Sequence, residues 1–433
     1  MNIAVILNFF EYFLNFPSDG GEHRYFFVTA REKFAGTRIT NLEFCDWEKS
    51  AIRSGQSPKG DVNDMFAIAR RLRSIPPGAD LGAIACVYER FFEEFLLRRQ
   101  INLLVGGATT GFERCGLATA KRLGVGTMYV WEGFFRPDTI SVDPQGMNAE
   151  SAFRKLPFEA IRTHQPTAGS GASIDRFIER GQQGVHRPTL DEIHGEKFDV
   201  FRQARNRFSE RRDLERIRLP FTQHMAARMS YYRALRNYER LEHVHKPFLF
   251  FPLQMHTDSN VVLNTPLFPY GTLVSTVLDS FRKARHDLQC DLVIKEHPLD
   301  VFRIHYDRKR EQGIHWLAPE IPVPQILNDP QCCGTVVANS TAGFESLLAG
   351  KPVLTLGNSL YSYPELVEIP KNPKDDDSIM QSIKNLPNRA VNADLTKKFA
   401  SCLYDKTQMR GNLEKIPGRE EVASFEKLWK VWQ

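Results

Sequence analysis

A strand-like segment, residues 288–294, runs directly into a group of ionisable side chains. Lys295, Glu296, His297 and Pro298 follow it without a spacer. A histidine at the end of a buried strand can donate a hydrogen bond or a proton to a departing phosphate, and Lys295 adds positive charge. An exposed turn with an internally satisfied histidine would have the same sequence. This stretch alone therefore leaves both interpretations open.

A second polar group stands where a strand ending at Asn339 passes into a helix. Ser340 and Thr341 occupy the turn, and Gly343 and Glu345 lie in the first turns of the helix. The free N–H groups at a helix start favour an anion. The pattern predicts close approach of a phosphate, with Glu345 reaching ribose hydroxyls. A plain N-cap is the alternative, because Ser and Thr are preferred there in any helix.

A third group follows a strand-like run that ends near residue 131. Glu132 offers a carboxylate as base or nucleophile, Gly133 permits a sharp turn and close approach of a substrate, and Arg136 can bind a carboxylate through two hydrogen bonds. The alternative is that Glu132 simply pairs with Arg136.

A fourth group follows the strand-like segment 247–253. The residues directly after it include Gln254, His256 and Asp258 at alternate positions. We expect their side chains to line the floor of a cleft. An ordinary polar loop is the alternative.

These side chains need a scaffold that brings strand ends together. Buried strand-like runs alternate with helix-like segments over residues 2–131 and again over residues 247–357. This rhythm predicts an α/β fold with two Rossmann-like, doubly wound domains that face each other across a cleft. We expect a helix over residues 25–35 and a solvated loop over residues 374–378. The domain boundaries are expected at residues 1–243, with a helical insertion at about 146–243, then 244–415, then a C-terminal helix at 416–433 that crosses back to the first domain.

The composition is that of a soluble globular protein. The chain has 433 residues, 42% hydrophobic and 25% charged, with a net charge of +5. The mild excess of positive charge fits an anionic substrate or an acidic membrane surface, and a dense basic tail typical of nucleic-acid binding is missing. The seven cysteines have no CxxC spacing, so we expect reduced thiols in a cytoplasmic protein and neither a disulfide framework nor a zinc site. No apolar run approaches the roughly 20 residues that span a bilayer.

Arginines are frequent over residues 196–243, where the pattern is helical. A solvated helical face is the simplest interpretation. A contact with a membrane or an anionic polymer is the alternative.

Four blocks together resemble the bacterial capsule polysaccharide biosynthesis family, whose KpsS- and KpsC-like members transfer the acidic sugar Kdo from CMP-Kdo. They are WEGFFRPDTISVDPQGMN, FPLQMHTDS, KEHP and NSTAGFESLLAGKPVLTLG, and they lie in the family's order between residues 131 and 357. The combination is also similar to bacterial sialyltransferases, which use an acidic-acidic-Gly, a His-Pro and a Ser-rich motif. Trp131 stands where an acidic residue is common, so Glu132 is the one carboxylate of its motif.

The resemblance implies a GT-B-like glycosyltransferase with an acceptor-side first domain and a CMP-sugar-binding second domain. It implies Glu132 as the catalytic carboxylate and His297 as the residue that assists departure of CMP, with retention of the anomeric configuration. The remaining site residues fall into two groups. Donor-binding residues are Lys295, Glu296, Pro298, Ser340, Thr341, Gly343, Glu345 and Gln254, and those for the substrate carboxylate or the cleft are Arg136, Gly133 and Asp258.

The same resemblance sets the expected partners. They are a nucleotide-sugar donor, a glycan or glycolipid acceptor and a peripheral contact with the inner membrane. We expect no metal and no cofactor, because a CMP-sugar carries one phosphate and has no diphosphate to neutralise. Two alternatives stay open: a transferase or epimerase that uses a UDP-sugar, and a non-catalytic scaffold of a capsule assembly complex.

Overall fold

The computed structural model describes residues 1–6, 24–29, 39–41, 57–75, 78–183, 226, 229, 231–233, 235–301 and 303–412. The Arg-rich residues 196–225 and the predicted C-terminal helix at 416–433 lie outside these ranges. The described chain forms two compact units. Unit 1 contains the described residues up to 156 together with 403–412, and unit 2 contains those from 157 to 402.

Unit 1 is built on a seven-stranded sheet with the order β13-β6-β5-β4-β1-β2-β3. Strands β5, β4, β1, β2 and β3 are parallel, whereas β6 runs antiparallel to β5 and β13 antiparallel to β6. Because β1 lies between β2 and β4, the strand order reverses beside it, as in doubly wound sheets. The strands are β1 (Asn2–Ile6), β2 (Arg24–Thr29), β3 (Ile39–Asn41), β4 (Leu103–Gly106), β5 (Gly126–Glu132), β6 (Thr139–Asp143) and β13 (Gln408–Arg410).

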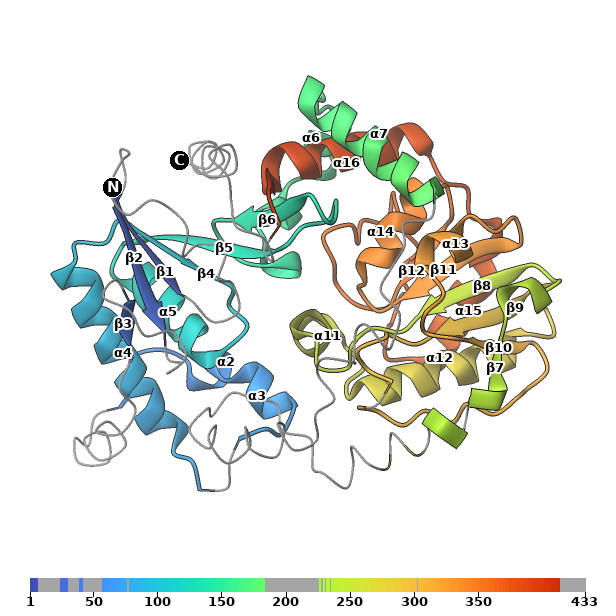
Figure 1. Cartoon of the computed structure of the whole chain (residues 1–433), viewed down its shortest axis with the longest axis horizontal. Coiled ribbons are helices and arrows are strands. Elements are labelled where there is room, and N and C mark those ends of the chain that lie inside the picture. The colour runs from blue at the N-terminus through green and yellow to red at the C-terminus, as the bar shows by residue number, and fades with distance from the viewer. Residues whose placement is uncertain are drawn as a thin grey trace. The chain divides into compact units, whose positions relative to one another are not determined.

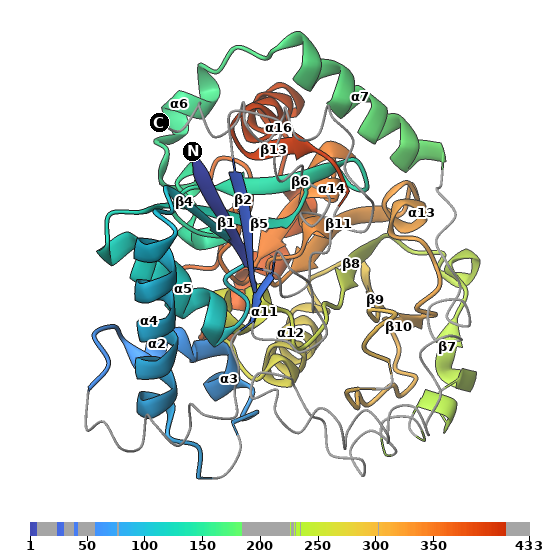
Figure 2. The ribbon, with the colours of Figure 1, turned by 60° about the vertical axis from the view of Figure 1, so that its left-hand side comes forward.

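Two long helices pack in this unit, α4 (Leu81–Arg98) against α5 (Gly111–Arg122), and α5 also contacts β4 and β5 (Figures 1 and 2). The start of α5 is fixed by a capping box: Glu113 N donates to Thr110 Oγ1, and Thr110 N donates to the Glu113 carboxylate at 3.1 Å. Shorter elements complete the unit. They are α2 (Val62–Met65), α3 (Ala67–Arg71) and two 3₁₀ turns, η2 (Asn148–Glu150) and η3 (Phe153–Lys155).

The helix expected over residues 25–35 is wrong in its first part. Residues 24–29 form β2, which pairs in parallel with β1 from Asn2 to Ile6. The sequence Tyr-Phe-Phe-Val is rich in aromatic and β-branched side chains, which favour a strand packed between two neighbours. Local helical spacing was the weaker signal.

Unit 2 contains a six-stranded sheet in which every pair is parallel, with the order β12-β11-β8-β9-β10-β7. The α/β class predicted from the sequence is thus confirmed in both units. The first long strand, β8, lies between β9 and β11, so the strand order reverses there. The strands are β7 (Tyr238–Glu239), β8 (Phe248–Pro252), β9 (Asp291–Lys295), β10 (Ile314–Leu317), β11 (Cys332–Val337) and β12 (Val353–Thr355).

The helices of unit 2 are α6 (Phe158–Arg162), α7 (Ala168–Gln183), α11 (Ser259–Asn264), α12 (Tyr270–Ala284), α13 (Val323–Leu327), α14 (Thr341–Leu348), α15 (Asp376–Asn385) and α16 (Ala393–Thr407), with 3₁₀ turns η4 (Leu235–Asn237), η5 (Leu241–His243) and η6 (Leu386–Asn388). Of these, α13 and α14 contact strands of the sheet, α12 contacts α15, and α7 contacts α13 (Figure 1). The loop expected at residues 374–378 is wrong in its last part, because α15 begins at Asp376. Asp375 accepts a hydrogen bond from Ser378 N at 3.0 Å, as an N-cap does.

Two segments group differently from the expected domain boundaries. The described residues from 157 to 243 cluster with unit 2, where α7 contacts α13, Asn328 Nδ2 donates to Gly181 O at 3.0 Å, and β7 pairs with β10. The chain returns to unit 1 within α16, and β13 then pairs with β6. Buried Gln408 anchors this return, because its Oε1 accepts from Phe134 N and its Nε2 donates to Ser141 Oγ.

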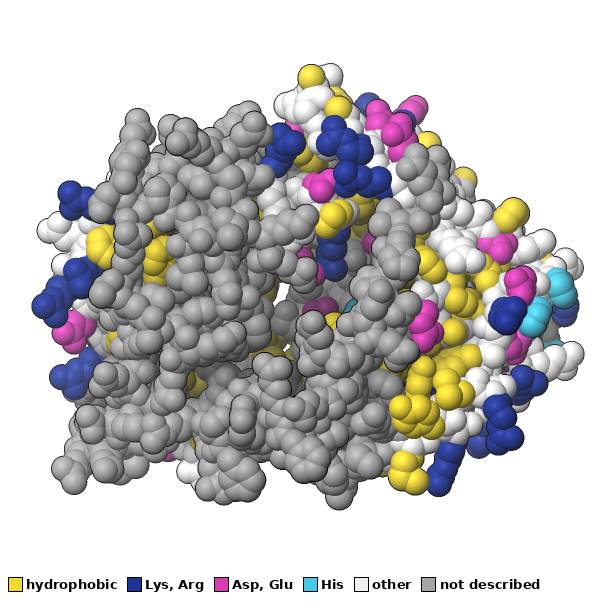
Figure 3. Space-filling view, viewed as in Figure 1, with side chains coloured by type: hydrophobic (Ala, Val, Ile, Leu, Met, Phe, Trp, Pro, Cys, Tyr) yellow, Lys and Arg dark blue, Asp and Glu magenta, His cyan; other side chains and the backbone are white. Residues whose placement is uncertain are grey.

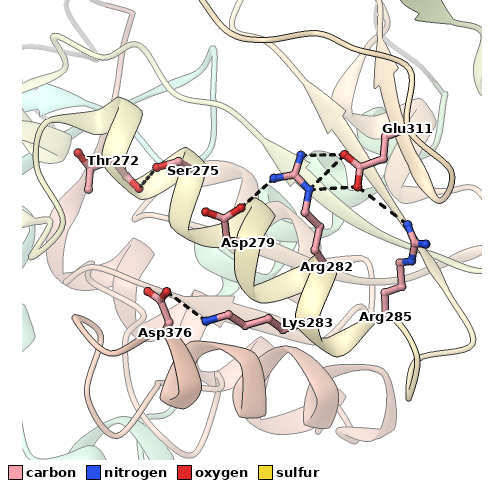
Figure 4. A network of polar contacts seen from close by, with 8 residues as sticks. All are labelled: Thr272, Ser275, Asp279, Arg282, Lys283, Arg285, Glu311 and Asp376. Atoms are coloured by element: carbon pink, nitrogen blue, oxygen red, sulfur yellow. Dashed lines mark hydrogen bonds and ion pairs between the residues drawn. The ribbon is translucent and has the colours of Figure 1, made fainter.

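An ion-pair network ties α12 to its neighbours on the surface of unit 2 (Figure 4). Arg282 holds the Glu311 carboxylate through both oxygens, with Nη2 to Oε2 at 2.7 Å, and its Nη1 donates to Asp279 at 2.8 Å. Lys283 pairs with Asp376 of α15. The hydrogen bond from Arg282 is the main reason why the pKa of Glu311 lies below its usual value of 4.5.

Replacing Arg282 with alanine should lower the free energy of unfolding by roughly 0.5 kcal/mol at pH 7, since both partners are partly exposed. The pKa of Glu311 is depressed in the folded state, so its contribution is present above the unfolded pKa and is lost as pH falls through the folded value. Urea unfolding of the wild type and Arg282→Ala at pH 7 and near pH 4 should show the difference narrowing at the lower pH. A difference that grows on acidification would contradict this account.

Lys and Arg side chains of the described residues are interspersed with acidic ones on the face drawn in Figure 3. Within the described ranges, no helix has the length and apolar content to cross a membrane.

Candidate functional site

The point where the strand order of unit 2 reverses carries a linked pair of amides. Gln254 follows β8 and Asn339 follows β11, and Gln254 Nε2 donates to Asn339 Oδ1 at 3.0 Å while Asn339 N donates to Gln254 Oε1 at 3.1 Å. Asn339 Nδ2 also donates to Asn260 O of α11. Ligands of open α/β sheets bind outside the carboxyl ends of the strands at such a position. The structure therefore brings Gln254 beside the Ser340 turn, and Asn339 is a partner that the sequence did not single out.

The ionisable residues at the end of β9 and directly after it differ in how deeply they are buried. Glu296 is fully buried and holds Arg308 through both carboxylate oxygens, with Arg308 Nη2 to Oε2 at 2.7 Å, and Tyr238 Oη donates to Glu296 Oε1 at 2.8 Å. Burial acts to lower the pKa of Arg308, but the contacts with Glu296 outweigh it and the net shift is upward. These contacts give Glu296 a structural role beneath the strand end, in place of the donor contact expected from the sequence.

Lys295 and His297 flank this buried pair. The side chain of Lys295 is buried, and its Nζ donates to Glu296 O at 3.3 Å. His297 is half-buried, and its Nδ1 accepts a hydrogen bond from Leu299 N at 3.2 Å. An Nδ1 that accepts a backbone N–H carries no proton of its own, so the proton of the neutral ring is on Nε2. Half-buried Pro298 lies between them and Leu299, in the turn that sets this geometry.

Asp300, three residues after His297 in the same loop, holds a second histidine. The buried Asp300 carboxylate accepts from His256 N at 2.7 Å and lies 2.7 Å from His256 Nδ1. Asp258, two residues after His256, accepts a hydrogen bond from Asn260 N at 2.8 Å and caps α11. The sequence analysis missed Asp300, although its place in the IKEHPLD stretch was visible.

The start of α14 has the form of an ordinary cap. Ser340 Oγ accepts from Ala342 N at 3.2 Å, and Thr341 is the first helical residue. The space above Gly343 is occupied, since a Cβ there would lie 2.4 Å from Tyr361 Oη. Burial raises the pKa of Tyr361, whose hydroxyl donates to Ser340 O. Gly343 therefore accommodates Tyr361, and the close approach of a phosphate expected at this glycine is replaced by a packing role.

Glu345 belongs to the second turn of the same helix and is half-buried. Its backbone carbonyl accepts from Ala349 N at 3.0 Å, as expected within a helix. The contact with ribose hydroxyls stays a prediction.

Glu132 ends β5 in unit 1 and pairs with Arg136, with Nη2 to Oε2 at 2.6 Å. The pairing that the sequence left as an alternative is thus present, but both side chains are more than half exposed, at 61% for Glu132 and 51% for Arg136. An ion pair this exposed is weak, so a ligand can replace either partner. Gly133 fits the expected sharp turn: a Cβ there would lie 2.2 Å from Thr139 O across the hairpin.

Asp143 is the residue of the same block that the sequence analysis did not identify. Its fully buried carboxylate accepts five hydrogen bonds, from Ser151 Oγ and from the backbone N–H groups of residues 145, 146, 152 and 153. It fixes the turn that follows β6, and Glu132 and Asp138 are the exposed carboxylates of the block. In the described part of the chain, no group of three or more His, Cys, Asp and Glu side chains could hold a metal ion.

Comparison with known proteins places the chain in a family. Residues 103–412 match the model of the capsule polysaccharide biosynthesis protein family, which is more than half of the chain. The chain belongs to this family. All four sequence blocks lie inside the matched range, so the resemblance drawn from them is confirmed.

Individual relatives are more distant. The capsule polysaccharide modification protein LipB of Neisseria meningitidis serogroup A is 26% identical over 309 residues, which are 65% of this chain and 69% of LipB. The capsule polysaccharide export protein KpsS of Escherichia coli is 31% identical over 118 residues, 25% of this chain and 29% of KpsS. The solved structure of Thermosulfurimonas dismutans KpsC, a beta Kdo 2,7 transferase, is 16% identical with a TM-score of 0.34, covering 82% of this chain and 98% of that one.

Proposed function

We propose that this protein is a glycosyltransferase that moves an acidic sugar, Kdo first among the candidates, from a CMP-sugar to a lipid-linked or growing capsular glycan. The observation that carries the proposal is the group of polar residues at the carboxyl ends of β8, β9 and β11, at the reversal of the strand order in a capsule biosynthesis family member. Doubly wound sheets bind their ligands there.

In this proposal, unit 2 holds the leaving group. Nε2–H of His297 donates a hydrogen bond to the phosphate of CMP as the bond to the sugar breaks. The start of α14, with Ser340 and Thr341, contributes N–H and hydroxyl groups to the same phosphate, and the charge of Lys295 stabilises it from beneath. Gln254 is fixed by Asn339 and orients the donor.

Glu132 acts on the sugar. The carboxylate stabilises or attacks the positively charged anomeric carbon that forms as CMP departs, which leads to retention when a second displacement follows. Arg136 is then available for the carboxylate of the donor sugar, because the weak pair with Glu132 gives way.

A nucleotide-binding experiment tests the assignment of the leaving group. The melting temperature of the wild type should rise with CMP and not with UDP or GDP, because a ligand that binds the folded state stabilises it. His297→Ala should lose most of this shift, whereas His243→Ala, an exposed histidine of the same unit, should keep it. A shift with UDP alone would favour a UDP-sugar enzyme. No shift with any nucleotide would favour the scaffold function.

A further inference from the structure

His256 is held on one side by a buried carboxylate. The Asp300 side chain is almost fully buried and accepts from the backbone N–H of His256 at 2.7 Å. Both of its oxygens lie within hydrogen-bond distance of His256 Nδ1, at 2.7 and 2.9 Å. A carboxylate is an acceptor, so the Nδ1 of His256 is the donor and carries the proton of the neutral ring.

The two histidines of this region consequently have opposite tautomers. His297 accepts at Nδ1 and carries its proton on Nε2, whereas His256 donates from Nδ1 and has a lone pair on Nε2. When the surroundings of two titratable side chains favour different protonation forms, one side chain can act as an acid and the other as a base. One ring is prepared to donate a hydrogen bond and the other to accept a proton.

The Nε2 atom of His256 also has no hydrogen-bond partner among the described residues, where the hydrogen bonds of His256 are those to Asp300 alone. The His256 side chain is 15% exposed. Asp300 N donates to His297 O at 2.8 Å, so Asp300 links the loop after β9, which contains His297, to the loop after β8, which contains His256. The titratable and charged groups around the pair, apart from Asp300 itself, are Asp258, His297, Arg303, Tyr270 and Tyr306.

We propose that His256 is a catalytic base that removes the proton of the acceptor hydroxyl, with Asp300 as its positioning residue. This inference rests on the proposed glycosyl transfer and adds a residue to it. In a retaining two-step transfer, the acceptor attacks from the face that CMP has left. A base for the second step therefore belongs beside the phosphate site, which is where His256 lies relative to His297.

The step balances as follows. The acceptor oxygen forms a bond to the anomeric carbon, and the bond between that carbon and the carboxylate nucleophile of the first step breaks with its electron pair returning to the carboxylate. The hydroxyl proton passes to His256 Nε2, and the resulting imidazolium is stabilised by Asp300. The proton then leaves to solvent.

The test compares His256→Gln and Asp300→Asn with the wild type in donor cleavage and in transfer to acceptor. His315→Gln is the matched control, because His315 also lies between carboxylates, with Nδ1 2.8 Å from Glu239 and Nε2 3.0 Å from Asp291, and has no free nitrogen to act as a base. His256→Gln should lower kcat for transfer by about 100-fold or more, with KM for the donor changed little and the first release of CMP retained. The fall of the wild-type kcat at low pH, the acidic limb of its pH profile, should be absent in His256→Gln. Asp300→Asn should lower kcat less and shift that limb.

Three outcomes would overturn the proposal: a kcat for His256→Gln close to the wild-type value, a loss confined to KM for the donor, or an unchanged acidic limb. If the wild type transfers no sugar from any CMP-sugar, the proposed function is wrong, and this result does not decide the role of His256. The ¹⁵N spectrum of the histidine side chains then decides on His256 separately. A proton on its Nε2, in place of Nδ1, would exclude the base.

Discussion

Replacing Arg308 with alanine is expected to lower the free energy of unfolding of unit 2 by about 3–5 kcal/mol, because it leaves the Glu296 carboxylate buried without its main partner. Folded domains are stable by only about 5–15 kcal/mol, so this is a large fraction of the total. Urea unfolding at pH 7 measures the loss. Lys309→Ala is the neighbouring control; its side chain is exposed and should change the stability by less than about 0.5 kcal/mol.

A double variant separates the buried charge from the packing of the side chain. Glu296→Gln together with Arg308→Met removes both charges and keeps an oxygen for the hydroxyl of Tyr238. It should recover much of the stability lost in Arg308→Ala, since a neutral pair has no desolvation cost to offset. A double variant as unstable as Arg308→Ala would show that the charge of Glu296 is not the cause.

Replacing Glu132 with glutamine is expected to lower kcat for sugar transfer by about 10²–10³-fold while leaving the melting temperature unchanged. The carboxylate is exposed at the end of β5 and its pair with Arg136 contributes little to stability, so the loss comes from chemistry and not from folding. The glutamine keeps the shape of the side chain and removes its charge. The measurement is a steady-state rate with a CMP-sugar donor.

Glu94→Gln supplies the control for this variant. Glu94 is an exposed glutamate of α4 in the same unit, and the same substitution there should leave the rate unchanged. Full transfer activity in Glu132→Gln would remove this residue from the mechanism. If capsule-related function in cells also survived both Glu132→Gln and His297→Ala, the scaffold function would be the better account.

The α/β class and the polar groups at strand ends could be predicted because they depend on local signals. The apolar run of β8 and the Ser-Thr turn before α14 are visible in a few consecutive residues. The strands β6 and β13 were not predicted, because an antiparallel pair between residues 139–143 and 408–410 depends on a partner far along the chain.

The roles within the candidate site depended on contacts that the sequence does not show. Glu296 and His297 are neighbours, yet Glu296 is fully buried against Arg308 and His297 is only half-buried. Gly343 suggested space for a phosphate until Tyr361, eighteen residues later, proved to fill it. Asp143 and Asp300 had no distinctive spacing, and only the hydrogen bonds to their carboxylates identify them.

Transfer from a defined donor tests the central claim most directly. Purified protein is incubated with CMP-Kdo or with UDP-linked sugars, together with a capsular glycolipid acceptor, and the acceptor is examined by mass spectrometry. The account predicts one added Kdo residue and an equal amount of free CMP, with no product from the UDP-sugars. Transfer from a UDP-sugar, with CMP-Kdo left intact, would contradict it.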